Sequence, residues 1–165
     1  MKNTPAKQVN KLVELVKEVN TCMLITIEKY TEHLSGRPMG ITKIEGDGTM
    51  WFFAKMSSPK VDEIEQNMNI SLVMMSESKN MYLMVNGTAR LSYDYGKMKE
   101  LWNPMMKVWF PLGIDDPEVL LIKVTPTEAS YWDNSSSKIN IAFNMVKAFV
   151  TGKEYDEGEH GRIAL

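Results

Sequence analysis

The side chains best suited to bind an anion lie within one stretch of the chain, residues 37–60. Arg37 begins this stretch, and Ser57, Ser58 and Lys60 end it. Arginine and lysine give charge-assisted hydrogen bonds to phosphate oxygens, and serine hydroxyls add neutral donors. These residue types predict phosphate binding if the fold brings Arg37 to the two serines and the lysine.

A β-hairpin would bring them together. Residues 37–44 and 49–55 read as strands, and the turn residues 45–48 between them are Glu-Gly-Asp-Gly. If the turn is centred in this segment, opposing residues have numbers that sum to about 93. This register predicts that Arg37 lies near Met56 and therefore beside the serines.

A helix start at the end of the hairpin adds a further attraction for anions. Ser58 is a good helix cap, Pro59 suits the first helical position, and residues 61–65 continue as a short acidic helix. The free N–H groups of a helix start favour a bound anion. The same residues also fit an ordinary helix start beside solvated cations, and the spacing alone leaves both readings open.

The familiar catalytic motifs are absent from the sequence. It contains no Gly-rich Walker loop, no Gly-x-Gly-x-x-Gly after a strand, no Gly-x-Ser-x-Gly and no pair of cysteines. The two histidines, His33 and His160, have no ligand partner at the short spacing of a metal site. We therefore expect no metal, and we assign no catalytic residue.

Composition narrows the class of protein. With 165 residues, 44% hydrophobic and 24% charged, and no long apolar run, the chain is expected to be one globular domain with no membrane span. A net charge of −2 gives no positive field for nucleic acid. Cys22 is the single cysteine, which favours a cytoplasmic location.

Hydrophobic periodicity predicts a chain dominated by strands. An amphipathic helix is expected over residues 5–19, a second helix after Ser58, and a last helix over residues 139–150. Residues 95–107 could be helical but contain Pro104, and residues 109–117 are expected to form an ordered loop. The expected strands are residues 21–28, 37–44, 49–55, 69–75, 81–92, 119–125 and 128–132.

Six to seven mainly antiparallel strands must cover or close their edges, which predicts a small barrel with short flanking helices, a β-rich α+β fold. Gly87, within one strand, marks an expected bulge or close approach of two backbones. Residues 1–150 are expected to form the single domain. Residues 151–165 are expected to be a charged, solvated tail.

An ordered series of motifs resembles a known family. The series covers the chain from the first helix to Asp133 and is more specific than any one of its pieces. It is similar to the general stress protein 26 group of the pyridoxamine 5'-phosphate oxidase-like, FMN-binding split-barrel proteins. The motifs are Arg37-Pro38-Met39, Trp51-Phe52-Phe53-Ala54, Ser57-Ser58-Pro59-Lys60, Gly87-Thr88-Ala89, Trp109-Phe110-Pro111-x-Gly113 and Tyr131-Trp132-Asp133.

The resemblance implies a split β-barrel homodimer with FMN at the subunit interface. Carried over by position, Arg37 and Lys60 hold the phosphate of FMN together with Ser58, and Ser57 lies beside them. Further residues would meet the flavin itself. They are Pro38 and Met39 along the flavin, Phe53 and Ala54 on a strand, Met81 and Tyr82 near the ring, and Trp109 and Phe110 from the partner subunit.

Two positions depart from the family pattern. Ala54 stands where the oxidases have a threonine, so a hydroxyl contact is lost, and Pro59 stands where many oxidases have a second basic residue. A pyridoxamine 5'-phosphate oxidase proper is not expected. Its C-terminal arginine and histidine would correspond here to His160 and Arg162, which follow a carboxylate-rich stretch.

The function implied by the resemblance is an FMN-dependent oxidoreductase acting on an unidentified small substrate, with reduced nicotinamide or another compound as electron donor. The cofactor itself carries the redox chemistry. One alternative is a stress protein that binds or stores flavin without specific turnover. Another is a split barrel that uses deazaflavin or haem.

Overall fold

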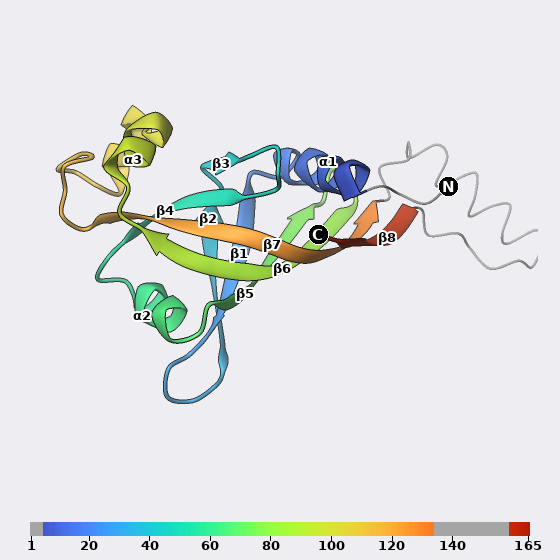
Figure 1. The fold of residues 1–165 in the computed structure, drawn as a ribbon, viewed down its shortest axis with the longest axis horizontal. Helices are drawn as coiled ribbons and strands as arrows, with labels where there is room; N and C mark the ends of the chain where they lie inside the picture. Colours follow the sequence, from blue (N-terminus) through green and yellow to red (C-terminus); the bar gives the residue numbers. More distant parts are fainter. Residues whose placement is uncertain (1–4, 134–158) are drawn as a thin grey trace, which may run out of the picture.

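The fold is built on one curled antiparallel sheet, and the computed structural model describes residues 5–133 and 159–165 (Figure 1). The strands lie in the order β2-β1-β5-β6-β7-β4-β3, with β8 paired to β7. The elements are α1 (Pro5–Lys17), β1 (Thr21–Ile27), β2 (Leu34–Gly40), β3 (Lys43–Ile44), β4 (Met50–Lys55), α2 (Pro59–Gln66), β5 (Asn69–Ser76), β6 (Met81–Ser92), α3 (Tyr95–Leu101), the 3-10 helix η1 (Pro104–Val108), β7 (Val119–Asp133) and β8 (Glu159–Ala164).

The two end strands of this order, β2 and β3, follow each other directly in the chain. The connecting residues bridge both neighbours, because the N–H of Ile41 donates to the carbonyl of Asn20 at 3.0 Å and the N–H of Thr42 donates to the carbonyl of Trp51 at 2.9 Å. The chain therefore passes from the β1 side to the β4 side and closes the sheet. This confirms the predicted β-rich α+β fold with a split barrel.

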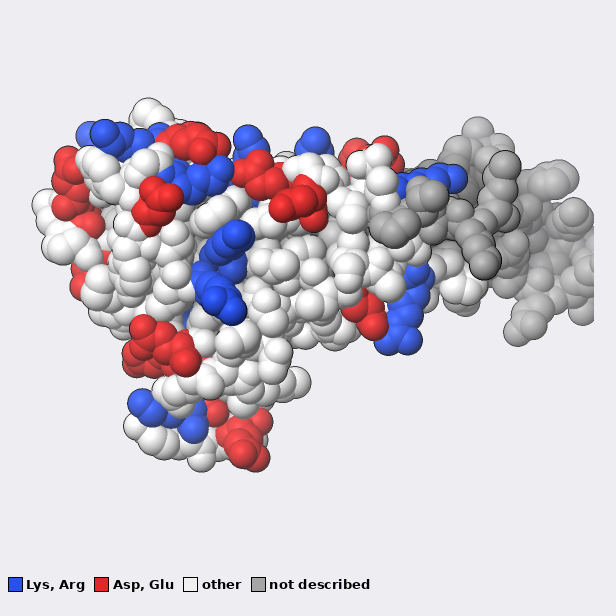
Figure 2. Space-filling model, in the orientation of Figure 1, with Lys and Arg blue, Asp and Glu red and all other residues white. Residues whose placement is uncertain are grey.

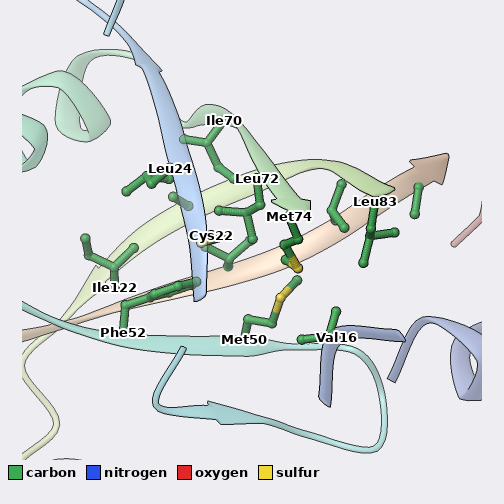
Figure 3. Close-up of a cluster of buried hydrophobic side chains, with 14 of the residues drawn as sticks. Val16, Cys22, Leu24, Met50, Phe52, Ile70, Leu72, Met74, Leu83 and Ile122 are labelled. Atoms are coloured by element: carbon green, nitrogen blue, oxygen red, sulfur yellow. The ribbon is translucent and has the colours of Figure 1, made fainter. Parts of the chain in front are cut away.

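Alternating side chains of the strands fill the barrel (Figure 3). Leu24, Phe52, Leu72 and Ile122 have no exposed surface at all. Each such side chain stabilises the fold by about 1.5–3 kcal/mol relative to leaving it in water. Two helices complete this core, α1 with three apolar residues and α2 with Val61 and Ile64. In the view of Figure 1, α1 lies above the strands and α2 below them.

A second, smaller apolar cluster covers part of the outer face of β4 and β7. It is closed by α3, η1 and the loop that follows them. The rings of Phe53 and Trp102 meet edge to face, with centroids 5.5 Å apart, which is a favoured geometry for aromatic pairs. Its buried members are Phe53, Met98, Leu101, Phe110, Val119 and Leu121.

The predicted hairpin of residues 37–44 and 49–55 is wrong in its first half. Lys43 and Ile44 pair with β4 across the expected turn, but Arg37 lies opposite Leu24 on β1 and not near Met56. The expected register requires one strand to keep one partner along its whole length. Here the strand bends after Gly40 and changes partner, so that β2 forms a seven-residue ladder with β1.

The bulge at Gly87 is confirmed. The register between β6 and β7 shifts between Asn86 and Gly87, where Gly87 lies opposite Pro126. A Cβ atom at Gly87 would overlap the carbonyl oxygen of Thr125, so only glycine fits this close approach. The register shift accommodates Pro126 within the ladder. The two strands expected at 119–125 and 128–132 are therefore one strand, β7.

The end of the chain belongs partly to the sheet. Residues 151–165 were expected to be a solvated tail, but Glu159–Ala164 form β8, which pairs antiparallel with β7. Arg162 donates to Glu128 at 2.7 Å across this pair. The helix expected over 139–150 and the domain limit at residue 150 lie outside the described residues, and both stay predictions.

Candidate functional site

The ladder between β1 and β2 positions Arg37. Strand alternation puts Ser35 and Arg37 on the same face of β2, and the residue opposite Ser35 is Thr26. Helix α2 approaches this place because its apolar residues on either side of Glu63, Val61 and Ile64, are buried in the barrel core. Packing of these two residues carries Glu63 inward, although its side chain is a carboxylate.

Arg37 and Glu63 form the centre of a hydrogen-bonded network, which we call the Arg37 cluster and which also contains Thr26 and Ser35. Arg37 Nη2 donates to Glu63 Oε2 at 2.8 Å and to Ser35 Oγ at 2.7 Å. Arg37 Nη1 donates to Thr26 Oγ1, and this hydroxyl donates to Glu63 Oε2 at 2.5 Å. The side chains of Arg37 and Glu63 are only 20% and 8% exposed.

Lys60, on the first turn of α2, adds a second cation next to this cluster. Partial burial and the positive charge of Arg37 hold the pKa of Lys60 below its usual value, and the Glu63 carboxylate opposes this effect. Within residues 5–133 and 159–165, no carboxylate forms an ion pair with Lys60. Two cations therefore share one carboxylate, an arrangement that an additional anion would stabilise.

The serines ahead of α2 have partners of their own. Ser58 is the N-cap residue, and its hydroxyl donates to the carbonyl of Lys55 at 2.6 Å rather than capping the helix. The N–H of Ser57 donates to Glu118 at 3.0 Å, and hydrogen bonds from Ser57 lower the pKa of that carboxyl. The turn that precedes α2 is thus held in place from the start of β7.

The residues predicted to meet the flavin lie in several separate places. Met39, Ala54 and Met81 pack in or against the barrel core. Phe53 and Phe110 are buried in the second apolar cluster. The roles of all five toward a flavin stay predictions.

The remaining predicted contacts are exposed. Pro38 lies on the outer face of β2 opposite Met23. Tyr82 on β6 is 45% exposed, and Trp109 after η1 is 61% exposed. The chain therefore brings together the predicted phosphate ligands Arg37 and Lys60, whereas the predicted ring contacts are dispersed between two apolar cores and the surface.

Three members of the Arg37 cluster, Thr26, Ser35 and Glu63, were missed by the sequence reasoning. Ser35 carries a usable signal, since a residue two positions before Arg37 on a strand points the same way. Glu63 also carries one, because it lies between Val61 and Ile64 on the apolar side of a short helix. A carboxylate at such a position needs a cationic partner.

Exposed cations elsewhere provide a contrast. Arg90 on β6 and Lys123 on β7 lie opposite each other, both exposed, and Figure 2 shows basic side chains gathered over these two strands. Lys123 also lies over the ring of Trp51, 5.7 Å from its centroid. Neither cation is enclosed by the hydroxyls and carboxylate that surround Arg37, so we take both as solvated.

Part of the outer face of the sheet is apolar and has no cover within the described chain. Its exposed side chains lie in cross-strand rows, with Val73 between Met23 and Met84, and Tyr82 between Met75 and Trp132. All six of these side chains are exposed. A contiguous apolar patch on a folded protein commonly marks an interaction surface.

Three other features would matter for function among the described residues: a metal site, a reactive thiol and a membrane-spanning helix. Among the described residues, no group of three or more His, Cys, Asp or Glu is placed to hold a metal ion. Cys22 is buried, and burial raises the pKa of its thiol to about 12, which keeps it protonated. No helix within residues 5–133 and 159–165 has the length and apolar character needed to cross a membrane.

Comparison with protein families agrees with the fold and with the motif series. The model of the family described as "Pyridoxamine 5'-phosphate oxidase like" matches residues 7–156. The match covers most of the chain. This protein therefore belongs to the pyridoxamine 5'-phosphate oxidase-like family.

Individual relatives are distant. Protein bli-3 of Neurospora crassa is 23% identical over an alignment 156 residues long, which covers 89% of this chain and 75% of that protein. A general stress protein 26 from Jannaschia sp. CCS1 has a TM-score of 0.77 at 20% identity and covers 97% of this chain and 99% of its own. At this identity the likeness supports the fold.

A solved structure with a more similar sequence is that of the general stress FMN/FAD binding protein from Xanthomonas citri. It is 27% identical, with a TM-score of 0.67, and the match covers 81% of this chain and 93% of that protein. The chain thus shares its family and fold with general stress proteins, one of which is described as binding FMN or FAD.

Proposed function

We propose that this protein binds FMN and that Arg37 and Lys60 hold the phosphate of the flavin. The observation that carries the proposal is the closeness of two cations, Arg37 on β2 and Lys60 at the start of α2. Lys60 is partly desolvated beside Arg37, and no carboxylate among the described residues forms an ion pair with it. A terminal phosphate supplies the missing negative charge. The description of the Xanthomonas citri protein as FMN/FAD binding supports the same assignment.

The residues present fit a phosphate better than a larger uncharged group. Arg37 is held rigidly by hydroxyls and a carboxylate, so little side-chain entropy is lost when it meets a ligand. Ser58 lies at the N-cap of α2, whose first turn follows directly with Lys60. Pro59, in place of a second basic residue, leaves Arg37 and Lys60 as the cations of this site.

A homodimer with flavin between its subunits is the second part of the proposal. The exposed apolar rows through Val73 and Tyr82 support this part, because a two-fold interface buries the same surface patch of both subunits. The exposed side chain of Trp109 is available to reach a flavin held by the partner subunit. The dispersed ring contacts of one chain are consistent with this arrangement, since a second chain would complete them.

The reaction that we propose is electron transfer between reduced nicotinamide, or another small donor, and an unidentified small acceptor. Bound flavin supplies the hydride and electron chemistry. The chain's own residues anchor and orient it. The proposal gives no side chain a role in proton transfer, because the predicted ring contacts are mostly apolar.

A flavin-binding protein without specific turnover is the second candidate function. One observation favours it: Glu63 already neutralises part of the charge of Arg37. A cofactor needed for every turnover is usually held firmly, whereas a carrier must release its ligand.

The visible absorption spectrum tests the proposal. Purified protein is mixed with FMN, desalted to remove unbound flavin and then measured, with riboflavin in a parallel sample as the ligand that lacks phosphate. We expect a retained flavin spectrum with FMN and a weaker one with riboflavin. Colourless protein after desalting, with no binding of FMN by fluorescence titration, would overturn the proposal.

A further inference from the structure

The Glu63 carboxylate is an anion bound directly to the guanidinium of Arg37. Its Oε2 accepts hydrogen bonds from Arg37 Nη2 at 2.8 Å and from Thr26 Oγ1 at 2.5 Å. Glu63 is 7% exposed and is carried on α2 between the buried residues Val61 and Ile64. This anion is therefore a built part of the site and not a mobile surface group.

The hydrogen-bond capacity of Arg37 is only partly used by the protein. A guanidinium has five N–H groups. Both hydrogens of Nη2 are directed to Ser35 and Glu63, and one of Nη1 to Thr26. Nε–H and the second N–H of Nη1 have no partner in the described part of the chain. A ligand can therefore bind Arg37 without displacing Glu63.

The charges give Glu63 two opposed effects. As an acceptor, it holds the guanidinium in one orientation. As a charge, it reduces the sum of Arg37, Lys60 and Glu63 to one positive charge, and it repels a phosphate that carries about −1.5 to −2 at neutral pH. Glu63 therefore fixes the orientation of Arg37 but weakens the attraction of the site for a phosphate.

We propose that Glu63 is the residue that positions Arg37 and, as an internal counter-anion, limits the affinity of the site for the flavin phosphate. This inference rests on the proposed function of the site. Its consequence is that FMN exchanges with free flavin in solution instead of remaining as a permanent prosthetic group.

The exchange Glu63→Gln separates the two effects. Glutamine keeps an acceptor oxygen for Arg37 and Thr26 but removes the charge. We expect the Kd of FMN to fall about tenfold, as expected for removal of one nearby like charge in a partly screened site. The Kd of riboflavin, which carries no phosphate, is expected to stay unchanged.

Two further variants complete the design. Glu65→Gln removes an exposed carboxylate from the same helix and is expected to change neither Kd. Glu63→Ala removes both the charge and the acceptor, so that Arg37 loses its orientation. FMN should then bind more weakly than to the Glu63→Gln variant, and thermal unfolding shows whether each variant is folded.

Inorganic phosphate provides a readout that does not depend on flavin. We expect phosphate to raise the melting temperature of the Glu63→Gln variant more than that of the wild type. If wild-type protein binds neither flavin, the proposed function fails, and the phosphate shift still tests Glu63. An unchanged or weaker preference for FMN over riboflavin in Glu63→Gln, or an equal phosphate shift in both proteins, would overturn the inference.

Discussion

The two ends of the proposed flavin site differ in how far a single chain builds them. At the phosphate end, Arg37 is joined to Thr26, Ser35 and Glu63 by hydrogen bonds, and Lys60 lies within reach of their charges. At the ring end, the predicted contacts are dispersed. Phe53 is enclosed in an apolar cluster, whereas other predicted contacts lie on the surface.

The difference follows from the physics of each end. A buried cation is tolerated only with partners supplied at once by the same fold, so the phosphate end has to be complete in each chain. Apolar and aromatic side chains carry no such requirement. They can stay partly exposed until a second chain or a ligand covers them. The phosphate end should therefore survive in a monomer, and the ring end should not.

The largest effect is expected from Arg37→Ala. This exchange leaves the Glu63 carboxylate buried without its cation, which should lower the free energy of unfolding by about 3 kcal/mol. FMN binding should be lost with it. Urea unfolding and flavin titration measure the two effects. Arg90→Ala, which removes an exposed cation from β6, is the matched control, and equal stability of the two variants would contradict a buried role for Arg37.

Val73→Glu would break the ring end while leaving the phosphate end intact. Val73 lies at the centre of an apolar row between Met23 and Met84. A charge there should weaken self-association by about 2 kcal/mol or more, roughly thirtyfold. Light scattering should show a monomer, and FMN affinity should fall although phosphate still protects the protein against heat. A dimer that persists with full flavin affinity would count against this interface.

Lys60→Met tests how much the second cation of the phosphate end contributes to FMN binding. Removal of one charge-assisted contact should weaken FMN binding by about 1.5–3 kcal/mol, roughly tenfold or more. Without ligand, the variant should be at least as stable as wild type, because the charged form of Lys60 is disfavoured in the folded state. Titration and thermal unfolding test the two statements. A clear loss of stability without ligand would mean that Lys60 has a structural role.

The smallest expected effect is a dependence of FMN affinity and of protein stability on pH. The pKa of Lys60 is lowered in the free protein, and a bound phosphate should raise it again. FMN affinity is therefore expected to weaken as pH rises through this lowered pKa. The stability of the free protein should instead increase as pH rises through the same range, because loss of the Lys60 proton removes an unfavourable charge from the folded state. Lys60→Met should abolish the alkaline decline in affinity.

The sequence predicted the fold well because its strands and helix starts are marked locally. Ser58 and Pro59 define the start of α2, and Gly87 marks a bulge that only glycine can fill. The convergence of Arg37 with Lys60 was predicted from a hairpin register that is wrong. The two meet because α2 packs beside the β1–β2 ladder, a tertiary contact that no local pattern reports.

Other parts of the site depend on information that lies far along the chain. Glu63 reads as one acidic residue of an ordinary helix until Arg37 is known to lie beside it. From the sequence, Phe53 and Phe110 fit both an apolar core and a flavin contact. The structure packs both rings against Trp102, and their role toward a flavin stays a prediction.

The most direct test of the account is the phosphorus-31 NMR resonance of FMN in the presence of the protein. Contact with Arg37 and Lys60 should shift and broaden the phosphate resonance, and Lys60→Met should return it toward the value of free FMN. Protein that retains the flavin while the phosphate resonance stays at its free position would contradict the central claim that the phosphate is the anchored end.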